Sequence, residues 1–264
     1  LVWLTPIFLL ILTALKSNRQ INSEQGAKFT IPEPFLPEGF MTILSNGAFW
    51  TSLMYSFMVV LPVVCIAVGF ATLAGYVLAK HKFLGRTWIF AIFVAGNFVP
   101  FQVLTFPVLR MMQDLGFGEW SPYNSLWSLI IFHGAFQTGF CVFFMRNFIA
   151  ALPTELIEAA RMEGANELQV FTRIILPLLR PALAALGLLI FTFVWNDFYW
   201  SLVLTQGDLM LVPTQLVNLA KGQWQNQWNV MAGGSIIVAL PPLVFFFFLQ
   251  RQFVAGLTLG AQKG

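Results

Sequence analysis

Residues 56–79 read SFMVVLPVVCIAVGFATLAGYVLA, and this stretch decides the fold. It contains no Asp, Glu, Lys or Arg and exceeds the roughly 20 apolar residues that a helix needs to cross a bilayer. Its apolar residues follow one another without the alternation of a membrane β-strand. Backbone polar groups in lipid must also be satisfied within the segment. The stretch therefore predicts a transmembrane α-helix.

The whole chain has the composition of a protein with several such helices. Of its 264 residues, 58% are hydrophobic and 9% are charged, against about 25% charged in an average soluble protein. This excludes a water-soluble domain, and it excludes intrinsic disorder, which needs low hydrophobicity and high charge. The 14 Lys and Arg residues form no basic cluster, so nucleic-acid binding is not expected.

Stretches with few charged residues predict four further spans. They cover residues 87–109, 126–148, 182–204 and 230–250. Within 182–204 the single charged residue is Asp197. Each stretch is long enough for a helix to cross the bilayer core.

Residues 1–15 are apolar but short for a span. They lack both an initiator Met and a basic region, which disfavours a signal peptide. We expect them to be the outer part of a sixth helix whose start is missing from this sequence. The sequence thus predicts an all-α polytopic membrane protein with six transmembrane helices, in a single transmembrane domain over residues 1–264.

The placement of basic residues predicts the orientation. Nine of the 14 Lys and Arg residues fall in the connections on one side of the six spans, and five fall on the other side. The positive-inside rule makes the first side cytoplasmic, so both termini are expected in the cytoplasm. The external loops are then about 16–50, 110–125 and 205–229, and the last of them is a candidate for contact with an external partner.

Small residues recur at four-residue intervals in the span 56–79. Ala67, Ala71 and Gly75 share one helix face, and such spacing lets two helix backbones approach closely. The alternative is that Ala and Gly are simply common in membrane helices.

The cytoplasmic loop 150–180, between the fourth and fifth spans, predicts a helix–Gly–helix unit. Thr154 can N-cap a short helix that Gly164 ends, because Gly tolerates the left-handed C-cap conformation. Asn166 can start a second helix, with Gln169 as its capping-box partner.

The short helix of this loop carries a weakly apolar surface. Leu156, Ala159 and Ala160 lie at helical spacing, flanked by Glu158 and Arg161. Such a surface suits docking into a groove of a partner protein. The alternative is an ordinary amphipathic loop that lies on the membrane surface.

The same loop resembles the EAA loop of binding-protein-dependent ABC importer permeases. The resemblance rests on Glu158-Ala159-Ala160, then Gly164, then Ile174 and Leu176-Pro177 at the family's spacing, with Glu163 where the family usually has Asp. The chain also resembles the maltose-transporter-type, carbohydrate-uptake members of that family elsewhere. The further segments are Gly75–Ala79, Phe83–Arg86, Trp195–Phe198, Leu240–Pro242, Gln250-Arg251 and Val254–Gly264.

The resemblance implies a type I ABC importer permease fold and a set of partners. A second, different permease completes the pathway, two copies of a cytoplasmic ATPase drive it, and an external solute-binding protein delivers the solute. The EAA loop is implied to form a coupling helix seated in a cleft of the ATPase. The coupling residues are then Glu158, Ala159, Ala160, Gly164, Arg161 and Leu156.

The resemblance places the protein in the cytoplasmic, or inner, membrane of a bacterium or archaeon. The chain has no Walker sequence, so ATP and Mg²⁺ are expected on the partner ATPase and the chain is not expected to be an enzyme. We expect no catalytic residue, no metal ligand and no cofactor in this chain.

Polar residues within the spans are candidates for the solute pathway. A charged group at the bilayer centre costs about 2.5–3.5 kcal/mol on insertion scales, so Asp197 should face a water-filled cavity or a polar partner. It either lines the pathway or holds neighbouring helices through hydrogen bonds. A lone His such as His133 is more often a satisfied structural residue. The candidate pathway residues are Trp195, Asn196, Asp197, Asn97 and Gln137.

The sequence favours a permease for a carbohydrate or a related polyol or glycoside. A non-sugar or phosphorylated solute is the alternative within the class, although Asp197 disfavours an unpaired anionic site. An ion-coupled secondary transporter needs ionisable relay residues in its spans, and only Asp197 and His133 qualify. A membrane enzyme needs clustered catalytic groups, which the sequence lacks.

Overall fold

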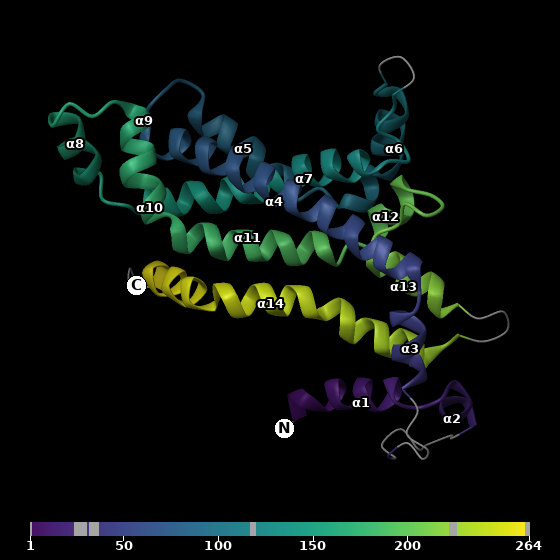
Figure 1. The fold of residues 1–264 in the computed structure, drawn as a ribbon. Coiled ribbons are helices and arrows are strands. Elements are labelled where there is room, and N and C mark those ends of the chain that lie inside the picture. Colours follow the sequence, from purple (N-terminus) through teal and green to yellow (C-terminus); the bar gives the residue numbers. More distant parts are fainter. Residues whose placement is uncertain (1, 24–30, 32–36, 117–119, 222–225, 262–264) are drawn as a thin grey trace.

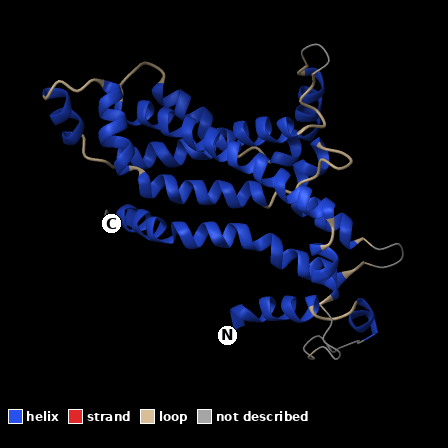
Figure 2. Ribbon diagram, in the orientation of Figure 1, coloured by secondary structure: helices blue, strands red, loops and turns tan. Residues whose placement is uncertain are grey.

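The computed structural model describes residues 2–23, 31, 37–116, 120–221 and 226–261, with side chains described as far as Arg251. Figure 2 shows that the regular elements in this part of the chain are helices, and no described residue lies in a strand. The all-α fold predicted from continuous apolar runs is therefore confirmed.

In the part of the chain that the structure describes, three helices are long and apolar enough to cross a membrane. They are α4 (Gly47–Lys80), α7 (Leu126–Ala150) and α14 (Trp228–Ala261), of which Trp228–Arg251 passes the hydropathy test. They contain the predicted spans 56–79, 126–148 and 230–250.

Two bent helix pairs are together long and apolar enough to cross a membrane, and counting each pair as one bent span gives up to five crossings in the described residues. In the first, α5 (Arg86–Gly96) is followed by η2 (Phe101–Leu104) and α6 (Thr105–Asp114), and the two parts meet at 92°. In the second, Glu167–Leu178, which belongs to the predicted loop 150–180, meets the apolar α11 (Arg180–Trp195) at 70°. At the N-terminus, α1 (Thr5–Ala14) is a shorter apolar helix that follows η1 (Val2–Leu4).

The predicted spans 87–109 and 182–204 each contain a helix break, so neither is one continuous helix. In the first, Pro100, which lacks a backbone N–H, stands in the break between Gly96 and η2, although α4 and α14 continue through Pro62 and Pro241. The second span stops at Trp195, and a separate α12 (Tyr199–Leu204) begins after three residues. Asp197 therefore lies in a connection between helices and not inside one.

The face of small residues on α4 packs against α7, as its spacing predicted. Ala67, Ala71 and Gly75 are all buried, and a Cβ added at Gly75 would lie 2.9 Å from the backbone nitrogen of Arg146. The two backbones thus approach as closely as a glycine allows. The other long helix, α14, packs on α11, α1, α3 (Glu38–Leu44) and α13 (Val212–Ala220).

The connecting helices gather at opposite ends of this bundle (Figure 1). One end carries α8 (Glu155–Met162), α9 (Glu167–Gln169), the π-helix η3 (Val170–Ile175) and α10 (Leu176–Leu178). The other end carries α6, α12 and α13. The first turn of α1 and the last turns of α14 both point toward the end that carries α8. A short α2 (Asn18–Ser23) follows α1.

Candidate functional site

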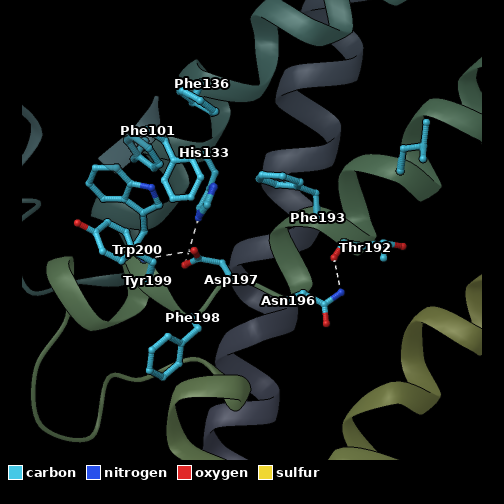
Figure 3. A pocket seen from close by; sticks show the side chains of 12 residues that line it. Phe101, His133, Phe136, Thr192, Phe193, Asn196, Asp197, Phe198, Tyr199 and Trp200 are labelled. Carbon is cyan, nitrogen blue, oxygen red and sulfur yellow. Dashed lines mark hydrogen bonds and ion pairs between the residues drawn. The ribbon is translucent and has the colours of Figure 1, made fainter. Parts of the chain in front are cut away.

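A cavity of about 560 Å³ opens where the two bent spans meet α7. Residues of η2, α7, α11 and α12 line it, and most of the lining side chains are aromatic. Figure 3 shows rings from all four elements around the cavity, with the polar side chains of Asn196 and Asp197 at the end of α11. We call this space the aromatic pocket.

Asp197 caps the helix that follows it. Its Oδ1 accepts the backbone N–H of Trp200 at 3.2 Å, and its Oδ2 accepts that of Ser201 at 3.0 Å. The Nε2 of His133, from α7, lies 3.4 Å from Oδ2. The His133 and Asp197 side chains are 1% and 9% exposed. Both carboxylate oxygens thus have partners, so the structure supports the helix-holding role for Asp197 while also placing it beside the pocket.

The neighbours of Asp197 are placed differently from one another. Asn196 lines the pocket, where its Nδ2 donates to the carbonyl of Thr192 at 2.7 Å. Trp195 is fully buried away from the pocket, and its Nε1 donates to the carbonyl of Val238 in α14 at 3.0 Å.

The other two predicted pathway residues do not line the pocket. Asn97 ends α5, and its Nδ2 donates to the carbonyl of Phe93 at 2.9 Å. Gln137 is buried on α7, one turn after His133. The spacing of four residues puts Gln137 on the helix face of His133. His133 and Phe136 line the pocket, but Gln137 does not.

Sequence reasoning missed the aromatic contact that joins the first bent span to α12. The rings of Phe101 and Tyr199 have centroids 5.9 Å apart, and the hydroxyls of Thr105 and Tyr199 share a hydrogen bond of 2.6 Å. These residues are about 100 positions apart in a chain rich in aromatics, so composition gave no signal for the pairing.

The predicted coupling surface lies on α8, at the tip of one end of the bundle (Figure 1). Leu156 is 44% exposed, and Glu158, Ala159 and Arg161 are also exposed. Ala160 is only 7% exposed, so it packs inward with the rest of the core and adds little to the outer surface of the isolated chain.

The turns around α8 follow the predicted pattern in two of three places. Gly164 has φ of +84°, the left-handed conformation expected after the short helix. Asn166 and Gln169 form the predicted capping box. Thr154 is the N-cap residue of α8, as predicted, but its hydroxyl accepts no N–H from α8 and instead lies 3.4 Å from the Nζ of Lys80.

A polar cluster that the sequence did not reveal ties this loop to α4. The Oε1 of Glu167 accepts the Nε–H of Arg161 at 2.8 Å. Its Oε2 accepts the hydroxyl of Tyr76 at 3.1 Å and lies 3.5 Å from the Nε2 of His81. The hydrogen bond from Arg161 holds the pKa of the Glu167 carboxyl below its ordinary value and raises the pKa of Arg161. Glu167 is therefore charged at neutral pH.

Comparison with known proteins places this arrangement in a family. Residues 67–258 match the family described as "Binding-protein-dependent transport system inner membrane component". The chain belongs to this permease family. The match begins within α4, covers α7 and the α8 loop, and confirms the family that the loop resembled.

Three relatives that match along most of the chain are named as permeases of sugar-transport systems. The permease is 31% identical to the arabinooligosaccharides transport system permease protein AraQ of Halalkalibacterium halodurans, over 98% of this chain and 91% of the relative. It is 34% identical to the alpha-glucoside transport system permease protein AglG of Rhizobium meliloti, over 94% of this chain and 67% of the relative. It is 30% identical to the diacetylchitobiose uptake system permease protein DasC of Streptomyces coelicolor, over 98% of this chain and 91% of the relative.

Solved structures share the fold. A chain of a bacterial ABC transporter involved in import of the acidic polysaccharide alginate matches with a TM-score of 0.75, at 23% identity over 95% of this chain and 90% of that one. A chain of the bacterial alginate ABC transporter in complex with an alginate pentasaccharide-bound periplasmic protein matches with a TM-score of 0.64, at 17% identity over 82% of each chain. The permease therefore has the type I ABC importer fold, and as a member of a permease family it is not itself catalytic.

Proposed function

We propose that this permease forms, with a second and different permease, the pathway of an ATP-driven importer for a neutral carbohydrate or a related polyol or glycoside. The observation that carries the substrate class is the aromatic pocket, in which the one lining carboxylate, Asp197, already accepts two backbone N–H groups. The names of the sugar-permease relatives support the same class.

The chemistry of the pocket suits an uncharged ring. The apolar faces of sugar rings pack on aromatic side chains such as Phe101, Phe193 and Tyr199, while Asn196 can hydrogen-bond to hydroxyls. A cavity of about 560 Å³ falls within the ordinary range for small-molecule sites. A phosphorylated solute would meet the charge of Asp197 in a medium of low dielectric, which disfavours it.

The coupling mechanism follows from the position of α8. Its exposed residues Leu156, Glu158 and Ala159 would seat in a cleft of one of two ATPase copies, and Gly164 allows the sharp exit from the helix. ATP and Mg²⁺ are bound by those ATPase subunits, whose closure would move α8 and switch the pathway from inward- to outward-facing. An external binding protein would deliver the solute to the loops at the α6–α13 end; Gln223 to Gln225 of the loop 205–229 lie outside the described residues.

This assignment puts the end that carries α8 in the cytoplasm of a bacterial or archaeal cell. The excess of Lys and Arg in the connections on that side supports this orientation. The first turn of α1 and the last turns of α14 point to the same end, which agrees with cytoplasmic termini.

Native mass spectrometry of the purified complex and of its binding protein tests the proposal. We expect one copy of this chain, one copy of a different permease and two ATPase copies, with a neutral saccharide, polyol or glycoside on the binding protein. A phosphorylated or amino-acid ligand would overturn the substrate class. A complex with two copies of this chain and no second permease would overturn the subunit arrangement.

A further inference from the structure

Two side-chain tethers join the α8 loop to the end of α4. The Nζ of Lys80 donates to the carbonyl of Leu152 at 2.7 Å, just before α8 begins. Glu167, five residues after α8 ends, accepts from Tyr76 of α4 and from Arg161 of α8 itself. The short helix is thus held to α4 on both its entry and its exit.

Of the two tethers, the hydrogen bond between Glu167 and Tyr76 is the one that involves a buried residue of the helix bundle. Tyr76 is 5% exposed, and its ring packs on Phe171 of η3 with centroids 5.2 Å apart. It follows Gly75, where a Cβ would lie 2.9 Å from the backbone nitrogen of Arg146 in α7. A movement of Glu167 would therefore reach α4 at a turn that packs closely on α7.

Backbone hydrogen bonds shape the exit from α8. Gly164 takes a left-handed conformation, its N–H donates to the carbonyl of Arg161, and the N–H of Ala165 donates to the carbonyl of Ala160, each at 3.0 Å. These bonds lie within the turn itself, so a link from the turn to another helix must come from side chains. Arg161 and Glu167 bridge the turn, one from each side, through a charge-assisted hydrogen bond of 2.8 Å.

We infer that Glu167 is a positioning residue for coupling: its carboxylate joins Arg161 on α8 to Tyr76 on α4, so that displacement of α8 moves α4. The inference rests on the proposed function, in which α8 receives the movement of an ATPase. The role of Glu167 is mechanical linkage within this chain and needs no contact between Glu167 and the ATPase.

The test is a double-mutant cycle in the assembled transporter with Glu167→Gln and Tyr76→Phe. The assay compares basal ATP hydrolysis with hydrolysis stimulated by the cognate binding protein, which is used with the solute that it retains on purification. We expect each variant to assemble and keep basal hydrolysis, while the stimulated increment falls about two- to fivefold, as for the loss of a partly exposed ion pair or its hydrogen bond. The double variant should lose no more than Glu167→Gln alone, because both changes break the same link.

Tyr55→Phe is the matched control, since it makes the same change on α4 in a turn far from α8, and it should keep the full increment. Glu167→Asp, which keeps the charge on a shorter side chain, should recover part of it. A normal increment in Tyr76→Phe alongside a loss in Glu167→Gln would overturn the linkage, because Glu167 would then act outside this chain. Additive losses in the double variant would overturn it as well. A wild-type complex that no binding protein stimulates would instead refute the proposed function, and the inference with it.

Discussion

Replacing Gly75 by Ala tests whether α4 and α7 are packed as closely as the structure indicates. A Cβ at this position would lie 2.9 Å from the backbone nitrogen of Arg146 and 3.1 Å from the Cβ of Met145. Because the nearest atom belongs to the backbone of another helix, a side-chain rotation cannot relieve the contact. The helices must separate, or α4 must shift.

The magnitude follows from two opposing effects. Overpacking of a close contact typically costs about 1–3 kcal/mol. A Gly→Ala change inside a helix gains up to about 1 kcal/mol from helix propensity. We therefore expect Gly75→Ala to destabilise the folded protein by about 1–2 kcal/mol.

Gly69→Ala provides the matched control on the same helix. A Cβ at Gly69 would meet nothing within 4 Å, so only the propensity gain remains and the variant should be as stable as the wild type or more so. The assay is reversible unfolding of detergent-solubilised protein in a denaturing detergent, followed by Trp fluorescence and circular dichroism. If Gly75→Ala proved as stable as Gly69→Ala, the close approach of α4 and α7 would be refuted.

Three further predictions concern the loop and the pocket. Gly164→Pro should abolish binding-protein-stimulated ATP hydrolysis without preventing membrane insertion, because Pro cannot adopt φ of +84°; normal stimulation would contradict the docking of α8. Asp197→Ala should lower the free energy of unfolding by about 0.5–2 kcal/mol through loss of the α12 cap, and Asp197→Asn, which keeps an accepting oxygen, should lower it less in the same detergent assay. The Glu167 carboxyl should titrate below its ordinary pKa in NMR of labelled protein, and its pKa should rise in Arg161→Gln. Because that pKa is lowered, the stabilising contact is complete at neutral pH and is lost only as the pH falls through the lowered value.

The features that depend on local sequence could be predicted. The charge-free run of residues 56–79 predicted α4, and the four-residue spacing of its Ala and Gly residues predicted the face that packs on α7. The capping box at Asn166 and the left-handed Gly164 also depend on neighbours within a few residues. Each of these signals is a short-range rule of backbone geometry or solvation.

The features that depend on tertiary contacts could not be predicted. A hydropathy average measures how apolar a stretch is and does not detect where a helix ends. The helix breaks near Pro100 and Asp197 were therefore not predicted. Tyr76 and Glu167 are 91 residues apart, and only the fold brings them together. The sequence pattern placed Ala160 on the exposed coupling surface of α8, but in the structure Ala160 is buried in the hydrophobic core.

The most direct test of the account is solute uptake by proteoliposomes that contain the assembled complex. The solute identified on the binding protein is supplied outside in radiolabelled form together with that protein, and ATP is trapped inside. The account predicts accumulation that requires both ATP and the binding protein and that falls with Gly164→Pro. Uptake driven by an ion gradient, without ATP or the ATPase subunits, would contradict the assignment of this chain as a permease of an ATP-driven importer.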